Sequence, residues 1–401
     1  MQFSDDPLAW LLEPASTDDF LSEYFNKRHF WARNENRDRF SGLLSFAQLD
    51  HIVGTYGLKH PEIRLARSED KIPFEDYTFK EDRFIDPLRV ARLFSEGATV
   101  IFRSLQNRHQ PIQHLCNALS KQATIQTQAN IYLTPPESQG FDIHWDTHDV
   151  FIIQIEGSKT WRMYDGGITL PIKSQRYDSD QYSPGEIIDE FVLNAGEVLY
   201  IPRGVMHAAA STSDTSLHIT LGFLGYSWAE LLVHVLGEVT QSDAYWRENM
   251  PFGFENDADK GLARLQHDFK ERLHRFIDEA DITPAIQAHL WQIQAFSRPR
   301  ESRFLTNAIH ARELLDSFSV ELVSGLSISL ASFEDRVYLI GGSRELSFPN
   351  AALKTLQTAI SGDAFHADQI EDDLDLESRK TVLATLLREG IIRTNGQSQK
   401  Q

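Results

Sequence analysis

Three side chains in two segments of the sequence could together hold a metal ion. His144 and Asp146 lie two residues apart in FDIHWDTHDVFII, whose apolar and β-branched residues predict a strand. Residues i and i+2 of a strand point to the same face, so the imidazole and the carboxylate would meet at one point. His207, in AGEVLYIPRGVMHAAA, is the third candidate. Two histidines and one carboxylate on one face of a metal leave other positions open, as in non-haem Fe(II) oxygenases.

The elements around these residues would bring them together. The chain between Asp146 and His207 is long enough for several strands, so the two segments could lie side by side in a barrel. A strand at 198–201 and a Pro-Arg-Gly turn would then place His207 at the barrel mouth. Lys159 follows a turn at 156–158, so its strand runs back beside the metal strand and could offer an ammonium group to an anionic co-substrate. The alternative is a lysine whose apolar stem carries its charge to the surface.

Two further histidines leave alternatives open. His218 and Thr220 share one face of TSLHITLGF, which is expected to close the barrel, and both could line the pocket. His218 is also the competing third ligand to His207. His148 has the same strand parity as His144 and could contact substrate, although a solvated strand end is the simpler interpretation. Because a single strand histidine is more often a hydrogen-bonded core residue than a ligand, the metal site depends on the three-residue pattern.

The motifs that carry these residues resemble those of the JmjC oxygenases. They are H-W-D, then V-F-I-I-Q-I-E-G-S-K-T-W-R, then G-E-V-L-Y-I-P-R-G-x-x-H. Within that family the sequence is most similar to the ribosomal oxygenases, which hydroxylate side chains of ribosomal proteins. The resemblance is strong over this core and looser over nearly the whole chain. It favours His207 over His218 as the third ligand, because the P-R-G-x-x-H turn matches the family.

The resemblance implies a role for each candidate residue. In the family the H-x-D…H set binds Fe(II). A basic residue at the position that corresponds to Lys159 binds the distal carboxylate of 2-oxoglutarate. Asn130 and Tyr132 share a face of the expected strand 126–133 and match positions that line the co-substrate pocket. The alternative is a core tyrosine with a bonded hydroxyl and an asparagine that holds backbone. The sequence departs from the family at Thr147-His148, where relatives often carry an acidic or polar pair.

The expected fold class is α+β, in three parts. Residues 1–225 are predicted to form the catalytic domain, with N-terminal helices and the double-stranded β-helix of cupin, jelly-roll and JmjC proteins. Residues 226–300 predict three amphipathic helices with more apolar surface than so small a bundle can cover. That surplus predicts a homodimer, and the resemblance implies a dimerisation domain; the alternative is helices packed on their own barrel. Residues 301–401 predict a winged-helix-like domain, and its acidic segment 371–375 argues against DNA reading.

Composition and charge narrow the class of protein. The chain has 401 residues, of which 41% are hydrophobic and 11% aromatic, as expected of a globular protein with a large core. No run approaches the ~18 apolar residues of a membrane span, and the acidic N-terminus lacks the basic region of a secretory signal. The net charge of −19 argues against general nucleic-acid binding and favours basic partners. A single cysteine, Cys116, excludes an internal disulfide and fits a reducing cytoplasm.

Residues and resemblance together predict an Fe(II)- and 2-oxoglutarate-dependent dioxygenase. Its expected activity is protein hydroxylation, on an arginine or histidine side chain of a basic ribosomal protein. Two other functions stay open. One is a JmjC-type lysine demethylase, although the sequence offers no obvious chromatin-reader module. The other is a non-catalytic cupin with a winged helix, which the intact metal-ligand set disfavours.

Overall fold

The computed structural model describes residues 6–68, 72–253, 258–297, 303–323, 325–342 and 344–395. Contacts divide the chain into two units, residues 1–225 with 293–401 and residues 226–292, and each is described by itself. Within the described ranges, no helix combines the length and the apolar character needed to cross a membrane.

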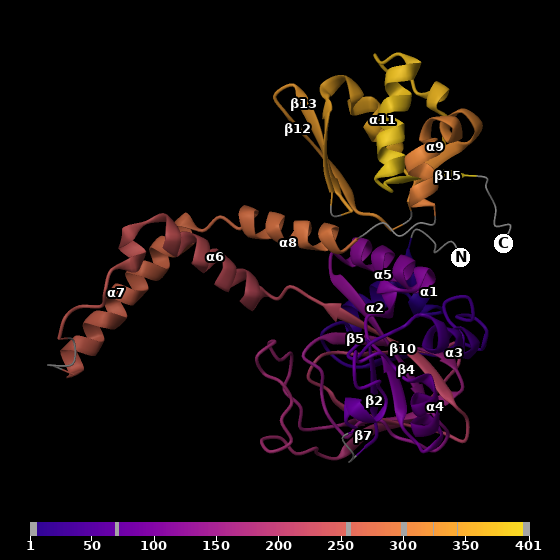
Figure 1. Cartoon of the computed structure of the whole chain (residues 1–401). Helices are drawn as coiled ribbons and strands as arrows, with labels where there is room; N and C mark the ends of the chain where they lie inside the picture. The colour runs from indigo at the N-terminus through magenta and orange to yellow at the C-terminus, as the bar shows by residue number, and fades with distance from the viewer. Residues whose placement is uncertain are drawn as a thin grey trace. The chain divides into compact units, whose positions relative to one another are not determined.

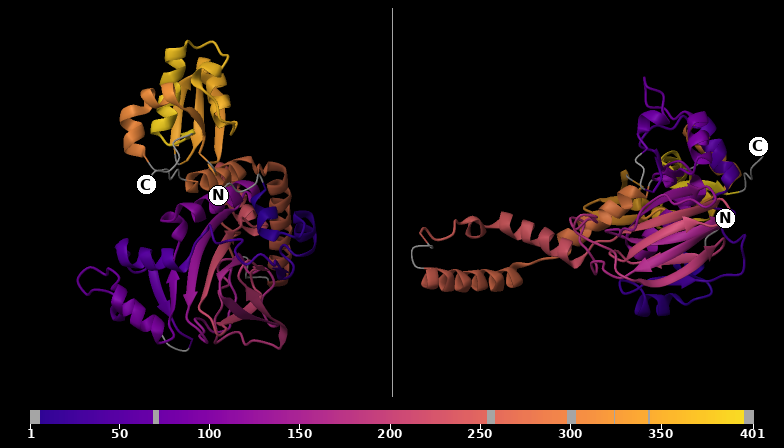
Figure 2. Two further views of the ribbon diagram at one scale, coloured as in Figure 1. Left: turned by 90° about the vertical axis from the view of Figure 1, so that its right-hand side faces the viewer. Right: turned by 90° about the horizontal axis from the view of Figure 1, so that it is seen from below.

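Two antiparallel sheets form the body of residues 1–225 (Figures 1 and 2). The larger sheet has the order β1 (Phe30–Ala32), β8 (Val198–Ile201), β5 (Asp149–Glu156), β10 (Ser216–Leu224), β4 (Gln126–Thr134), β3 (Thr99–Phe102) and β2 (Ile63–Ala66). The smaller has the order β7 (Ile187–Asn194), β6 (Ser158–Tyr164) and β9 (Met206–Ser211). Such a pair of facing sheets is the arrangement of a jelly-roll barrel.

Alternating side chains of β5 separate two hydrophobic cores. Phe151 and Ile153 belong to the large core that the seven-stranded sheet shares with the N-terminal helices. Val150 and Ile152 point to the opposite face and pack with β6 and β7 residues between the sheets. Because successive side chains of a strand point to opposite faces, a strand buried on both sides needs this continuous apolar run.

The helices of this body begin where the sequence carries strong start signals. They are α1 (Pro7–Leu12), α2 (Thr17–Glu23), α3 (Phe46–Thr55), α4 (Pro87–Ser95) and α5 (Gln110–Ala123). Asp6 and Asp86 accept hydrogen bonds from the first turns of α1 and α4, and a proline follows each cap. Their apolar faces cover the outer side of the seven-stranded sheet.

The turn from β5 to β6 requires glycine. Gly157 has a φ of 64°, in the left-handed region, and a Cβ there would lie 2.1 Å from the carbonyl oxygen of Thr215. Only glycine meets both conditions without strain. The turn starts β6 in a fixed register, and Lys159 is its second residue.

The prediction of a regular strand at His144 and Asp146 is wrong. The strand β5 begins at Asp149, and the two candidate ligands lie in the irregular extended segment before it. His144 is joined to His207 of β9 by an isolated antiparallel bridge, and not by the continuous ladder of a strand. The apolar, β-branched run that predicted the strand starts four residues later than the ligand pair, which explains the misplaced boundary.

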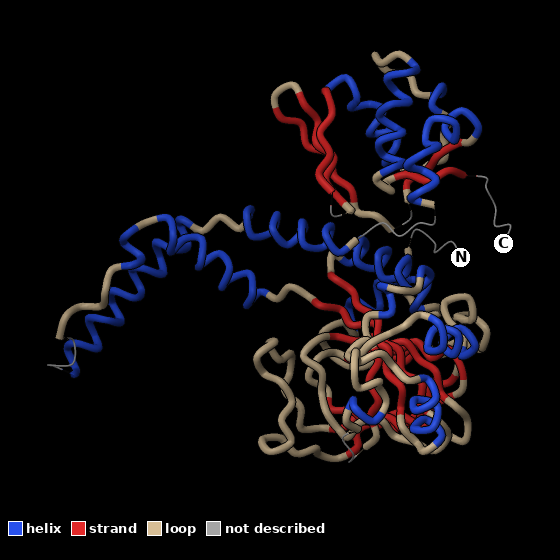
Figure 3. Tube along the Cα trace, viewed as in Figure 1, coloured by secondary structure: helices blue, strands red, loops and turns tan. Residues whose placement is uncertain are grey.

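The second unit consists mainly of helices (Figure 3). They are α6 (Trp228–Ser242), α7 (Ala258–Glu279) and α8 (Thr283–Phe296), the last of which runs past the end of the unit. Its small core includes Leu231, Val235 and Val239 of α6 with Ala285 of α8. Other apolar side chains of the same helices stay exposed, including Trp228 at 79% and Phe269 at 62%.

The C-terminal residues have a core of their own. The elements are α9 (Phe304–Ser317), β11 (Ser319–Leu322), β12 (Ile328–Phe333), β13 (Arg336–Gly341), β14 (Arg344–Pro349), α10 (Leu353–Ile360), α11 (Leu376–Arg388) and β15 (Ile392–Asn395). The strands β12, β13 and β14 form one sheet, and β11 pairs with β15. A winged-helix type for this part, and the domain boundaries at 225 and 300, stay predictions.

Candidate metal centre

The metal-ligand candidates are held in register by backbone hydrogen bonds. The N–H of His207 donates to the carbonyl of His144 at 2.8 Å, and the N–H of His144 donates back at 3.2 Å. The N–H of Gly204 donates to the carbonyl of Asp146 at 3.0 Å. These bonds tie the segment before β5 to residues 204–207, so pairs of residues that lie 63 and 58 positions apart in the chain become neighbours.

The three side chains converge on one point. Potential ligand atoms of His144, Asp146 and His207 all lie within 4.8 Å of one another. Among the described residues, these three form the cluster of histidine and acidic side chains that could hold a metal ion. His207 Nε2 lies 4.0 Å from an Asp146 carboxylate oxygen. Two imidazoles and a carboxylate at these separations suit a first-row divalent ion such as Fe(II), which prefers nitrogen and oxygen donors.

Hydrogen bonds orient both imidazoles toward that point. The Nδ1 of His144 donates to the carbonyl of Asp142 at 2.8 Å, and the Nδ1 of His207 donates to that of Val205 at 2.9 Å. A carbonyl only accepts, so in each ring Nδ1 carries the proton and Nε2 keeps its lone pair. This is the usual way in which proteins fix the tautomer of a metal-binding histidine.

Burial keeps one of these rings uncharged. Desolvation, and then the neighbouring charge of His144, lower the pKa of His207 to about 4, while the Asp146 carboxylate acts in the opposite direction. The ring is therefore neutral at physiological pH, and a neutral imidazole is the form that binds a metal.

A cavity of about 350 Å³ opens beside the three candidate ligands, between the two sheets. Lys159 of β6 lines it and is 4% exposed. Its ammonium group has no ion pair or hydrogen bond within the described part of the chain, and burial lowers the pKa of Lys159 to about 7. A buried cation without a partner is costly, which makes the site suited to an anion.

Asn130 and Tyr132 line the same cavity from β4. A position in the cavity lining and a structural role, the two alternatives considered for these residues, are compatible. The Oδ1 of Asn130 accepts from the backbone N–H of Ser104 at 3.0 Å, so this residue holds backbone as well. Tyr132 stacks on His218 at 4.9 Å between ring centroids. Burial, and then the charge of Asp146, raise the pKa of the tyrosine, which stays protonated.

His218 and His148, whose roles the sequence leaves undecided, take different positions. His218 lines the cavity but is not part of the metal-ligand group. The His148 imidazole lies over the backbone of Gly222, where an added Cβ would be 2.8 Å from the ring, and His148 does not line the cavity. It is partly buried against β10, and not a solvated strand end as its position suggested.

Sequence reasoning missed several residues around the cavity. Arg64 and Arg103 line it beside Phe141, but the charged segment that contains Arg64 carries no readable pattern. Trp145, between two ligands, is buried and packs edge-on against Tyr182 at 4.5 Å. This contact anchors the polar connection between β6 and β7 on the metal-ligand segment. The H-W-D motif and the tyrosines of that connection were visible, but their pairing was not.

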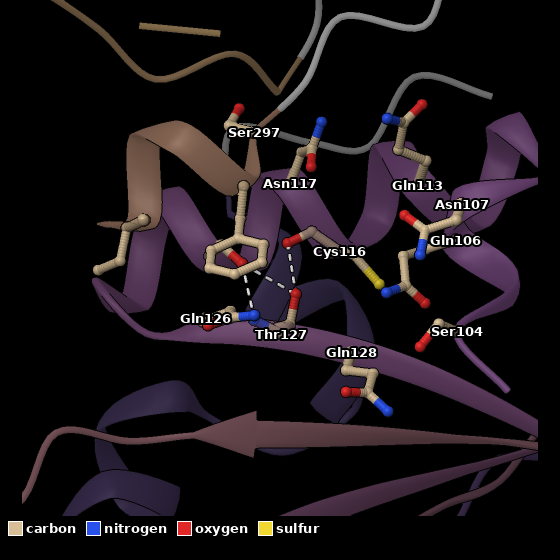
Figure 4. Close-up of a pocket in the computed structure, with 13 residues that line it drawn as sticks. Ser104, Gln106, Asn107, Gln113, Cys116, Asn117, Gln126, Thr127, Gln128 and Ser297 are labelled. Carbon is tan, nitrogen blue, oxygen red and sulfur yellow. Dashed lines mark hydrogen bonds between the residues drawn. The ribbon is translucent and has the colours of Figure 1, made fainter. Parts of the chain in front are cut away.

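A second cavity, of about 180 Å³, lies where α5 and the start of β4 meet the end of α8 (Figure 4). Amide and hydroxyl side chains, such as those of Asn117 and Thr127, line it together with the apolar Ile293 and Phe296, and none of its lining residues is charged. Burial raises the pKa of the Cys116 thiol at its edge to about 12, so the thiol stays protonated and unreactive.

Parts of this chain are similar in sequence to known proteins. The JmjC domain family matches residues 103–231. The chain is 33% identical over 257 residues to the bifunctional lysine-specific demethylase and histidyl-hydroxylase NO66 of Dictyostelium discoideum. That alignment covers 62% of this chain and 49% of the relative. It is 26% identical over 258 residues to ribosomal oxygenase 1 of Danio rerio, covering 61% and 46%. The chain thus spans about half the length of these relatives.

Solved structures agree with the fold. The crystal structure of the Escherichia coli ribosomal oxygenase YcfD matches with a TM-score of 0.52 and 20% identity, over 95% of this chain and 98% of that chain. A YcfD structure in complex with cobalt and 2-oxoglutarate matches with the same TM-score and 19% identity, over 96% and 99%. The predicted α+β fold with a JmjC barrel is confirmed. The chain therefore contains a JmjC domain and is a homologue of the NO66 and ribosomal oxygenase proteins.

Proposed function

We propose that this chain is an Fe(II)- and 2-oxoglutarate-dependent protein hydroxylase that acts on a ribosomal protein. The observation that carries the proposal is one cavity with the His144, Asp146 and His207 cluster on its wall and the buried, unpaired ammonium of Lys159 within it. The relatives named as hydroxylases and oxygenases, and the YcfD complex with cobalt and 2-oxoglutarate, support it.

The side chains present fit both groups. His144, Asp146 and His207 would hold Fe(II), with the Nε2 lone pairs of both rings already directed by their Nδ1 hydrogen bonds. When bound, Fe(II) supplies the reduction of O₂, in which 2-oxoglutarate becomes succinate and CO₂ and the second oxygen atom enters a substrate C–H bond as a hydroxyl. Lys159 would neutralise the distal carboxylate of the co-substrate.

The walls of the cavity would exclude water from that reaction. Val150, Ile152 and Trp161 are buried between the sheets and line the cavity behind the ligands. Water-free surroundings strengthen the pairing of Lys159 with a carboxylate. The protein's own part is thus to orient the co-substrate and to place one C–H bond of the substrate near the metal position.

The charges of the cavity favour a neutral target side chain. Arg64, Arg103 and Lys159 line it, and neither arginine has an ion pair within the described residues. The carboxylate among the described lining residues is Asp146, a proposed ligand. A guanidinium or methylammonium group would enter without a counter-charge, whereas a neutral imidazole would not be repelled. We therefore propose histidine as the target, in line with relatives named histidyl-hydroxylases.

The function is tested by mass spectrometry of ribosomal proteins incubated with the protein, Fe(II), 2-oxoglutarate and O₂. We expect one oxygen atom to be added to a histidine of one ribosomal protein, with succinate formed in equal amount. Addition to an arginine would contradict the charge argument. Loss of methyl groups from methyl-lysine would indicate a demethylase, and absence of any succinate would indicate a non-catalytic protein.

The proposed ligands are tested by metal titration. Replacing His207 by Ala should lower Fe(II) or Mn(II) affinity by at least about a hundredfold, because even residues that only orient ligands contribute 10- to 100-fold. His148→Ala is the matched control, since that ring lies against Gly222 and does not line the cavity. Unchanged metal affinity in His207→Ala would remove this residue from the site and point to His218.

The role of Lys159 predicts a pH dependence of co-substrate binding. Its pKa is about 7 in the unliganded site, and a bound carboxylate favours the charged form and raises that pKa. Above pH 7 binding must therefore take up a proton, so 2-oxoglutarate affinity should fall by up to about tenfold per pH unit. Calorimetric titration of Mn(II)-loaded protein measures it.

Two variants separate charge from structure at this position. Lys159→Arg keeps its charge at every pH of the titration, so any affinity it retains should not fall above pH 7. Lys159→Ala should lose about 2–5 kcal/mol of 2-oxoglutarate binding with little loss of metal binding. An Ala variant with full co-substrate affinity would make Lys159 a structural residue only.

We also propose that the protein is cytoplasmic, because its single cysteine, Cys116, is buried and free, as suits a reducing compartment. We further propose that it is a homodimer joined through α6, α7 and α8. Trp228 and Phe269 are exposed on helices whose own core is small. Light scattering at micromolar concentration should give about twice 45.8 kDa. Phe269→Asp should shift the mass toward the monomer, whereas Phe333→Asp, an exposed phenylalanine of β12, should not. A wild-type mass of 45.8 kDa would refute the dimer.

A further inference from the structure

His218 is a buried imidazole whose ring nitrogens have no hydrogen-bond partner among the described residues. It lies on β10, lines the cavity of the metal centre and is 3% exposed. Two aromatic rings fix its plane: Tyr132 stacks on it with an interplanar angle of 8°, and Trp161 meets it edge-on at 6.0 Å. The ring is therefore held in place by packing and not by hydrogen bonds.

Neither ring nitrogen of His218 has a hydrogen-bond partner in the described part of the chain, and its Nδ1 is fully buried. Burial, and then the charge of Lys159, lower the pKa of His218 well below its usual value, so the ring is neutral. A neutral imidazole carries one N–H donor and one acceptor. Because buried polar groups in proteins are nearly always hydrogen-bonded, this ring points to a ligand.

The neighbours of His218 indicate what kind of ligand. Lys159 and Trp161 project from the same face of β6 into the cavity, and the indole Nε1 of Trp161 is also buried without a partner. One cation and two neutral rings with N–H groups thus line the cavity from β6 and β10. The carboxylate among the described lining residues is Asp146, which is a proposed metal ligand. A carboxylate has two oxygens and about four acceptor sites, more than a single ammonium group fills.

We propose that His218 donates a hydrogen bond from a ring nitrogen to the distal carboxylate of 2-oxoglutarate, beside Lys159, and so orients the co-substrate. The inference rests on the proposed function and deepens it. His218 is then a co-substrate residue, in place of the metal ligand that the sequence left open. The stack on Tyr132 prevents the ring from turning away, so little rotational freedom is lost when the co-substrate binds.

The test compares two 2-oxo acids. Mn(II)-loaded protein is titrated with 2-oxoglutarate and with 2-oxobutyrate, which has the same 2-oxo acid end and no distal carboxylate. In His218→Leu, affinity for 2-oxoglutarate should fall by about tenfold or more, as for the loss of a hydrogen bond to a charged group. Affinity for 2-oxobutyrate and for Mn(II) should stay within about twofold of wild type.

Two further variants complete the test. His218→Gln keeps an N–H donor and should recover part of the lost 2-oxoglutarate affinity; it also serves if the Leu variant does not fold. His148→Ala, at a histidine outside the cavity lining, should bind both acids as wild type does.

The outcomes separate this inference from the proposed function. Equal loss for both acids would show that His218 only shapes the pocket, and no loss for either would show that it does not contact the co-substrate; each overturns the inference while the function stands. Wild-type protein that binds Mn(II) but not 2-oxoglutarate would overturn the proposed function, and this inference with it.

Discussion

The site depends on one antiparallel bridge, the pair of backbone hydrogen bonds between His144 and His207. The bridge joins a segment that precedes β5 to the start of β9, and it sets the distance between two imidazoles whose Nδ1 atoms are already engaged by carbonyl groups. Asp146 is tied to the same place through Gly204. These backbone bonds fix the three candidate ligands relative to one another, and such fixed positions lower the free energy lost on ordering a metal site.

The second constraint is the charge of the cavity interior. The chain has a net charge of −19, yet its first cavity is lined by Arg64, Arg103 and the buried Lys159. An acidic protein, which attracts basic partners, thus has a cavity with a buried ammonium at Lys159 and exposed guanidinium groups at Arg64 and Arg103. This separation is consistent with a basic protein substrate that presents a neutral side chain to a site already holding a dicarboxylate.

Much of this site could be predicted from the sequence because its signals are local. His144 and Asp146 are two residues apart, the strand 198–201 was placed correctly as β8, and Lys159 follows a turn that Gly157 requires. What could not be predicted depends on contacts between distant strands. The ring nitrogens of His218, which have no partner within the described ranges, and the contact of Tyr182 with Trp145 follow from register and packing that no short pattern encodes. The wrongly predicted strand at His144 has the same origin, because the sequence does not distinguish a segment that pairs through an isolated bridge from a regular strand.

The most direct test of the account is an anaerobic titration followed by visible absorption. Protein is loaded with Fe(II), and 2-oxoglutarate is then added, because a 2-oxo acid that chelates Fe(II) through both of its donor oxygens produces a charge-transfer absorption. We expect this absorption to appear with one equivalent of each component in wild-type protein and to be absent when Asp146 is replaced by Ala. An absorption that persists in Asp146→Ala, or that never appears in wild-type protein, would contradict the assignment of this cavity as an iron and 2-oxoglutarate site.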